Sequence, residues 1–204
     1  MTRPFCVLVA MTMVAVRAGA QNPPTPPPSP QPAPAPAPTP AARPAPPPTQ
    51  SPQIDCNWLT VDSASKTATF LLTAGLTGLN GGLNFNGYKD GALTFSVPVN
   101  WNVVIEFTNH DGNLTHSAEV IDTVKPVPPG PVDPSFPRAM TVRLTQGIAT
   151  DGKDTMRFTA NKPGSYLIFC AVPGHGLAGM WIRFRVSATD TKPALVSTAS
   201  AGGR

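Results

Sequence analysis

The stretch GSYLIFCAVPGHGLAGMWIRFRV, residues 164–186, places two apolar segments on either side of a loop rich in glycine and proline. In the second segment Ile182, Phe184 and Val186 recur at every second position, with arginines between them. This period is typical of a β-strand with one buried face. The first segment, residues 165–170, is short, apolar and bounded by turn residues, as strands are. We therefore expect two neighbouring strands joined by the loop AVPGHGLAG.

Similar short apolar segments, separated by turn residues, precede this stretch along the chain. The expected strands are residues 58–61, 67–72, 93–97, 103–108, 117–121, 139–144 and 155–159. The sequence DSASK predicts a hairpin turn between the strands at residues 58–61 and 67–72. The sequence PVNWN predicts a second one between the strands at residues 93–97 and 103–108. No segment shows a long helical period, because proline and glycine interrupt every candidate. The pattern predicts an all-β fold, a two-sheet antiparallel β-sandwich with Greek-key connectivity.

The ends of the chain differ from this pattern in composition. Residues 1–20 combine an early arginine, an apolar run and the small residues AGA, which predicts a secretory signal peptide. Residues 21–52 hold 16 of the 27 prolines and almost no charge, which is typical of a disordered, semi-rigid linker. We expect the folded domain at residues 53–188 and a flexible tail at residues 189–204.

Charge and motifs exclude several classes of function. Residues 53–188 contain ten basic and ten acidic residues, so the domain has no basic excess that would favour nucleic acid. The sequence contains no Gly-x-Ser-x-Gly, no phosphate-cradling glycine loop and no signature of paired catalytic carboxylates. A multicopper enzyme would need more histidines than the three that the chain has. We expect a protein that is not an enzyme.

The loop at residues 170–180 gathers side chains that bind soft metals. Cys170, His175 and Met180 follow one another at intervals of five residues. A fourth ligand has to come from elsewhere, and two histidines are candidates. His116 immediately precedes an expected strand that can carry it to the same end of the sandwich, whereas His110 lies in the turn-like sequence NHDG. His116 is the stronger candidate of the two.

Two imidazoles, one thiolate and a weak thioether are the donor set of blue copper electron-transfer sites. Structural zinc usually takes several cysteines, and c-type haem attachment would need C-x-x-C-H, which is absent. A binuclear copper centre would need a second cysteine in the loop. A disulfide between Cys56 and Cys170 is the main alternative, but it would leave the spacing of the histidine and the methionine unexplained.

Three segments resemble the cupredoxins, and among them the group of sulfocyanin and rusticyanin. These segments are LNFNGYKDGALTFSVPVNW (83–101), NLTHSAEVI (113–121) and KPGSYLIFCAVPGHGLAGMW (162–181). The sequence departs from the family pattern at Thr115, at the inserted NHDG and in the long stretch at residues 124–137. The resemblance implies a cupredoxin-like fold and one type 1 copper ion per chain, with His116, Cys170, His175 and Met180 as the metal ligands.

The resemblance further implies a monomer that carries single electrons outside the cytoplasm, at the periplasm or the cell surface. Its partners would be redox proteins such as a cytochrome or a terminal oxidase. An uncleaved N-terminal segment, the alternative to a signal peptide, would keep the protein near the membrane. Ser117 would help to hold the ligand loops together. An apolar shell would exclude water from copper, and its expected members are Phe85, Phe169, Val172, Leu177 and Trp181. The alternatives are a copper storage or delivery protein and a metal-free adhesion domain.

Overall fold

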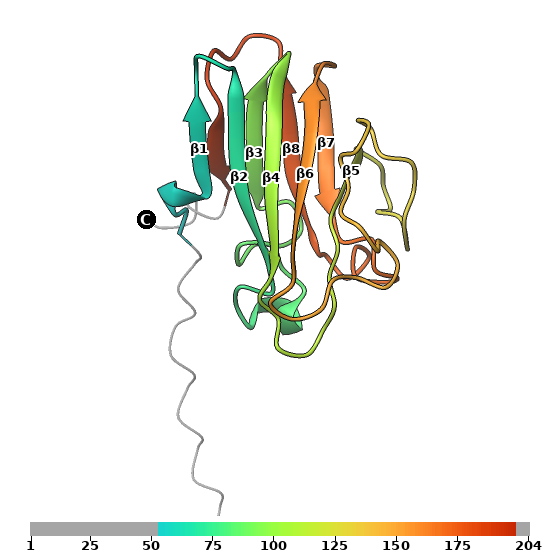
Figure 1. Ribbon diagram of the computed structural model, residues 1–204. Helices are drawn as coiled ribbons and strands as arrows, with labels where there is room; N and C mark the ends of the chain where they lie inside the picture. The colour runs from blue at the N-terminus through green and yellow to red at the C-terminus, as the bar shows by residue number, and fades with distance from the viewer. Residues whose placement is uncertain (1–52, 199–204) are drawn as a thin grey trace, which may run out of the picture. The chain divides into compact units, whose positions relative to one another are not determined.

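The computed structural model describes residues 53–198, which lie within one compact unit and form two β-sheets packed face to face (Figure 1). The first sheet has the strand order β1-β2-β4-β6, and the second has the order β5-β7-β8-β3-β9. The first sheet comprises β1 (Leu59–Asp62), β2 (Thr67–Ala74), β4 (Trp101–Asn109) and β6 (Lys153–Ala160). The second comprises β3 (Leu93–Pro98), β5 (Glu119–Asp122), β7 (Gly164–Phe169), β8 (Trp181–Ser187) and β9 (Ala194–Ser197).

Two short 3-10 helices, η1 (Cys56–Trp58) and η2 (Leu79–Gly82), complete the regular elements of residues 53–198. No helix in this range is long and apolar enough to cross a membrane. The expected signal peptide and linker, residues 1–20 and 21–52, lie outside the described residues.

The all-β sandwich predicted from the sequence is confirmed, and so is the antiparallel pairing of β7 with β8 across the loop. The DSASK hairpin between β1 and β2 is also present. The sheets are mixed, however, because β2 pairs with β4 in parallel and β3 pairs with β8 in parallel.

The hairpin predicted around PVNWN is wrong, because β3 and β4 belong to different sheets. The chain changes sheet in the turn between them. The N–H of Val99 donates to Ser187 in the second sheet, and the N–H of Asn100 donates to Ala160 in the first. The turn is therefore a corner of the sandwich, and Pro98, which has no N–H to donate, ends the strand there.

Residues 139–144 do not form the predicted strand. Their only ladder contact is an isolated bridge between Met140 and Glu119 of β5. Arg138 and Arg143 both adopt positive φ angles, of 66° and 54°, which interrupts an extended backbone at both ends of the segment. The flexible tail expected from residue 189 also differs from the structure, because β9 pairs antiparallel with β3.

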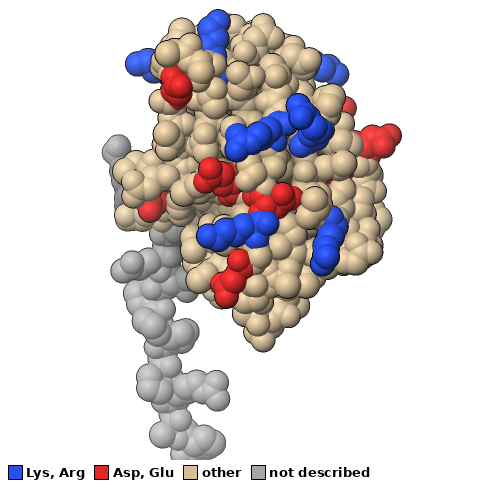
Figure 2. Space-filling view, viewed as in Figure 1, with Lys and Arg blue, Asp and Glu red and all other residues tan. Residues whose placement is uncertain are grey.

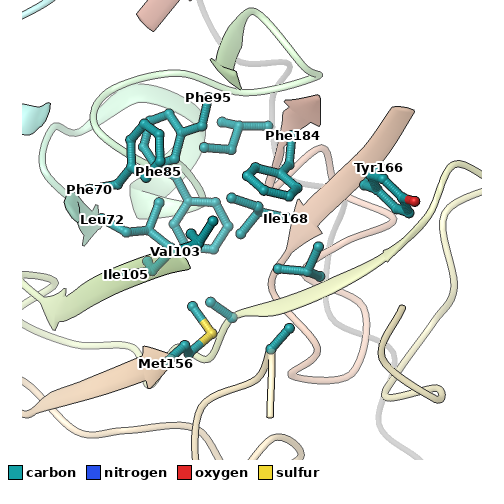
Figure 3. Close-up of a cluster of buried hydrophobic side chains, with 14 of the residues drawn as sticks. Phe70, Leu72, Phe85, Phe95, Val103, Ile105, Met156, Tyr166, Ile168 and Phe184 are labelled. Atoms are coloured by element: carbon teal, nitrogen blue, oxygen red, sulfur yellow. The ribbon is translucent and has the colours of Figure 1, made fainter. Parts of the chain in front are cut away.

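The core fills the space between the two sheets (Figure 3). Every second residue of β2 is fully buried, and Phe70 stacks on Phe95 of the opposite sheet with 4.5 Å between ring centroids. On β8, Ile182 and Phe184 face this core while the two arginines are exposed, as the alternation predicts. This core supports β7 and β8, the two strands that carry the loop between them.

Candidate metal centre

The loop between β7 and β8 folds back on itself at one end of the sandwich. Its ends are closed by a hydrogen bond of 3.0 Å from the N–H of Cys170 to the carbonyl oxygen of Met180. Inside the loop, His175 donates to Val172 and Met180 donates to His175, each through the backbone at 3.1 Å. The glycine- and proline-rich sequence thus forms a compact turn with the cysteine, the histidine and the methionine on one short segment.

His116 comes from the segment between β4 and β5. Its backbone exchanges two hydrogen bonds with Ile148, of 3.1 and 2.7 Å, in an isolated bridge. This bridge holds His116 at the same end of the sandwich as the β7–β8 loop. His110 is exposed and is absent from the cluster that the other two histidines form with Cys170. The structure therefore brings His116, and not His110, to the cysteine.

Three potential ligand atoms converge at this point. Cys170 Sγ lies 3.5 Å from Nδ1 of His175 and 3.9 Å from Nδ1 of His116. The ligand atoms of these three residues all lie within 4.8 Å of one another, and no other such cluster of His, Cys, Asp and Glu occurs in residues 53–198. Met180 is fully buried and packs in the same hydrophobic core as Cys170.

Ser117 connects the two segments that carry the cluster. Its backbone N–H points at Cys170 Sγ at 3.4 Å. Its hydroxyl donates to the carbonyl oxygen of Leu144 at 2.8 Å and accepts from the N–H of Ala171 at 3.2 Å. These contacts fit the role that the sequence predicts for Ser117 in holding the loops together.

Burial sets the protonation of the cluster. It lowers the pKa of His116 and of His175 and outweighs the opposite effect of Asp111 on both rings, which favours the neutral imidazoles that a metal binds. Burial raises the pKa of the Cys170 thiol, although backbone N–H groups of Ser117 and Val172 oppose this. Two neutral imidazoles beside a desolvated sulfur, with a thioether at the end of the loop, fit copper better than they fit harder metals.

No disulfide competes for the thiol. Cys56 and Cys170 are both free, the first exposed near η1 and the second fully buried in the cluster. The disulfide considered from the sequence is therefore absent.

A carboxylate that the sequence analysis did not single out contacts the cluster. Oδ2 of Asp111 lies 3.2 Å from Nε2 of His116, and both side chains are buried. Burial alone would raise the pKa of Asp111, but hydrogen bonds from the N–H groups of Asn113 and Leu114 and from His116 outweigh it, and the pKa lies below its usual value. The Asp-Gly turn in NHDG was the available signal, because aspartates in such turns bind the backbone ahead of them.

Residues 55–197 match the family model described as "Sulfocyanin (SoxE) domain". The chain belongs to the sulfocyanin family. This confirms the resemblance to cupredoxins that the sequence shows. A curated sulfocyanin from Sulfolobus acidocaldarius is 25% identical over 120 residues, and the match spans 54% of this chain and 58% of that protein.

Two solved structures are also similar to this chain. Rusticyanin from Thiobacillus ferrooxidans is 25% identical with a TM-score of 0.46, over 64% of this chain and 88% of that one. A dithionite-reduced auracyanin from Roseiflexus castenholzii is 22% identical with a TM-score of 0.43, over 58% of this chain and 96% of that one.

In this sulfocyanin-family domain the predicted apolar shell is divided between two layers. Phe85 is fully buried in the main core. Phe169 belongs to a second, smaller cluster with Leu167, on which the partly exposed Trp181 packs. Leu177 is 55% exposed and so lies on the surface of the loop instead of lining its interior.

The motif Asn84-Phe-Asn-Gly87 supports the loop from the other side. The side chain of Asn84 donates to the carbonyl oxygens of Thr77 and Leu79 and fixes the segment around η2. From η2, the side chain of Asn80 donates to the carbonyl oxygen of Ala178 at 2.8 Å. The segment at residues 83–101, which resembles the cupredoxins, is thus connected through η2 to the β7–β8 loop by hydrogen bonds.

Proposed function

We propose that this chain is a blue copper protein that carries single electrons through one mononuclear type 1 copper site. The proposed ligands are His116, Cys170, His175 and Met180. The observation that carries this proposal is the convergence of Cys170 Sγ with Nδ1 of both histidines within 4.8 Å at one end of a rigid sandwich. Membership of the sulfocyanin family supports the choice of copper and of electron transfer.

Copper bound by these residues would supply a couple between the cuprous and cupric states, which exchanges one electron at a time. The protein contributes fixed positions for the donor atoms. Backbone hydrogen bonds join Cys170 to Met180 and His116 to Ile148. Because these contacts do not depend on the charge of the site, the same ligand arrangement serves both oxidation states.

Exclusion of water is the second contribution of the protein. His116, Cys170 and Met180 are fully buried, so solvent does not reach these side chains. Ser117 gives the sulfur a hydrogen-bond donor at 3.4 Å, which stabilises the thiolate that a metal requires. A dry, apolar environment disfavours the more highly charged cupric state.

His175 is the proposed route for the electron, because it is the one member of the cluster that reaches the surface. The exposed Leu177 lies two residues after it in the same loop. Figure 2 shows basic and acidic side chains interspersed over the face of the domain that it presents. An exposed apolar side chain beside a partly exposed ligand suits brief contacts with redox proteins.

The cellular setting is proposed from the sequence and the family. A signal peptide at residues 1–20 and a proline-rich spacer at residues 21–52 would place the domain in the periplasm or at the cell surface, as a monomer near the membrane. A cytochrome or a terminal oxidase would then be the electron partner. In this proposal the protein is not an enzyme and does not bind nucleic acid.

The experiment that tests the function is a copper titration of the full purified chain followed by absorption spectroscopy and a redox titration. We expect one copper per chain, an intense visible band from the copper–thiolate bond and a reversible one-electron couple. A colourless copper complex that releases the metal readily to a chelator would instead indicate storage or delivery. Failure to bind copper at all would contradict both functions.

A further inference from the structure

Asp111 occupies a turn directly after β4 and is held there by four hydrogen bonds. Its N–H donates to the side chain of Asn109 at 2.9 Å, and its carbonyl oxygen accepts from the hydroxyl of Thr150 at 2.7 Å. Its carboxylate oxygen Oδ1 accepts from the N–H groups of Asn113 and Leu114 at 2.8 and 3.0 Å. These contacts use one carboxylate oxygen and leave Oδ2 to face His116.

The two ring nitrogens of His116 therefore have different neighbours. Nε2 lies 3.2 Å from Oδ2 of Asp111, and Nδ1 lies 3.9 Å from Cys170 Sγ. An ionised carboxylate only accepts hydrogen bonds, so the contact requires the proton of the neutral imidazole on Nε2. Nδ1 is then left with a free lone pair directed at the site, which is the form that a metal ligand needs.

Two glycines leave the space that this carboxylate fills. Gly82, with a φ of 91°, would bring a Cβ atom within 2.1 Å of Asp111 Oδ2. Gly75, with a φ of 64°, would bring one within 2.6 Å of the Asp111 Cβ. Any other residue at either position would clash with the carboxylate or its stem. The end of β2 and the segment of η2 are thus both shaped around Asp111.

Asp111 is one of the residues that line a hollow of about 330 Å³, together with this glycine-rich segment. Asp111 itself is only 8% exposed, so solvent screens its charge less than it would screen a fully exposed carboxylate. Among residues 53–198, no carboxylate makes a hydrogen bond to the ring of His175. The hydrogen bond of Asp111 is therefore confined to His116, although its charge also raises the pKa of His175.

We propose that Asp111 is a positioning residue of the metal centre, which fixes the tautomer of His116 and lowers the reduction potential by placing a negative charge beside this ligand. This inference rests on the proposed function. A buried negative charge stabilises the cupric state relative to the cuprous state, and a hydrogen-bonded imidazole is a stronger donor. The apolar environment of the rest of the site raises the reduction potential, and Asp111 opposes this effect.

The test compares Asp111→Asn and Asp111→Ala with the unaltered full chain. In Asp111→Asn, the amide oxygen keeps the hydrogen bonds from Asn113 and Leu114, so the amide NH₂ group faces Nε2 of His116. We expect the proton of the metal-free imidazole to move to Nδ1 in this variant, and Asp111→Ala to give a mixture of tautomers. Nitrogen-15 NMR of the metal-free proteins reads the tautomer directly, without copper or activity.

The copper-loaded proteins provide the second measurement. We expect both variants to bind copper about 10- to 100-fold more weakly. We also expect the ratio of reduced to oxidised protein at a fixed applied potential to rise at least about tenfold, a shift of about 59 mV. Asp90→Asn is the matched control. The carboxylate of Asp90 is exposed, and its backbone N–H donates to the carbonyl oxygen of Gly179 in the β7–β8 loop at 2.9 Å. This variant should leave the tautomer of His116 unchanged. It should change the ratio of reduced to oxidised protein at the same applied potential less than twofold.

Two results would overturn the inference. One is a His116 tautomer that stays the same in both Asp111 variants, and the other is a potential that moves no more than in Asp90→Asn. If the unaltered protein gave no copper–thiolate band, the proposed function would fail on that observation. The tautomer in the metal-free proteins would still decide whether Asp111 positions His116.

Discussion

Cys170 combines complete burial with contacts to both histidines and to Ser117. We expect Cys170→Ala to abolish the visible copper band and to leave the sandwich folded, because the core between the sheets and not the metal holds the strands. Absorption and far-UV circular dichroism measure the two effects. Cys56→Ala is the control and should keep the band, since this thiol is exposed near η1. A coloured Cys170→Ala protein would contradict the ligand assignment.

The two histidines of NHDGNLTH give a second test at this scale. His116→Ala should eliminate the blue spectrum, because it removes the imidazole that lies 3.9 Å from the sulfur. His110→Ala should change the spectrum little, because this side chain is exposed. Electron paramagnetic resonance of the cupric proteins separates the two variants. The reverse pattern would show that His110 supplies the ligand after a rearrangement of the turn.

Glu119 on β5 is a buried acid, and its Oε1 has no hydrogen-bond partner. Burial raises its pKa to about 7, the N–H of Val132 lowers it and the charge of Asp133 raises it again. The folded state thus favours the protonated acid. Its contribution to stability is complete below the ordinary value of 4.5 and is lost as the pH rises through 7.

We therefore expect Glu119→Gln to gain stability relative to the unaltered protein as the pH rises from 5 to 8. The gain should approach about 3 kcal/mol, from about 1.4 kcal/mol per pKa unit. Comparing urea unfolding of the two proteins cancels the opposing contributions of His116 and His175, whose lowered pKa values favour the folded state more at high pH. A difference that stays constant between pH 5 and 8 would show that Glu119 is ionised in the folded protein.

At the scale of elements, residue patterns predicted where most strands lie but not which strands pair. Alternation of buried and exposed residues marks β8 clearly, because each arginine there is exposed and each intervening apolar residue is buried. The parallel pairing of β3 with β8 joins Thr94 to Arg183, and no local signal specifies a partner so distant in the chain. The segment after Pro137 has residues typical of a strand, but the positive φ angles of Arg138 and Arg143 interrupt its extended backbone.

β9 provides a test of where the domain ends. It pairs with β3, and Leu195 packs against the main core, although sequence composition placed this segment in a flexible tail. We expect a chain that stops at residue 188 to be less stable than one that stops at residue 198, by about 1 kcal/mol for the partial apolar burial of Leu195. Urea unfolding measures this difference. Equal transition midpoints would show that β9 adds nothing to the fold.

At the scale of the whole molecule, the candidate metal centre was predictable to the extent that its residues lie on one loop. The spacing of Cys170, His175 and Met180 is a local property of the sequence. The position of His116 before a strand favoured it over His110 as the fourth ligand. Asp111 was not predictable in the same way. Its contact with His116 depends on a turn after β4 and on space left by Gly75 and Gly82, which only the folded chain brings together.

The folded sandwich should exist without copper and become more stable with it. Copper that binds the native site in preference to the unfolded chain adds about 2.7 kcal/mol at a hundredfold excess over its dissociation constant. We expect the metal-free chain to unfold cooperatively at a lower temperature, measured by calorimetry with and without a chelator. A metal-free chain without any unfolding transition would mean that the metal, and not the core, holds the two sheets together.

The outer strands of both sheets give the molecule resistance to aggregation. Three of the four edge strands, β1, β5 and β9, are only four residues long, and the fourth, β6, has Lys153 and Arg157 exposed along it. Short and charged edges offer little unpaired backbone for a second sheet to extend. The domain should therefore stay dispersed at the high local concentrations of a crowded compartment. A carrier that must collide with its partners and separate from them again depends on this property.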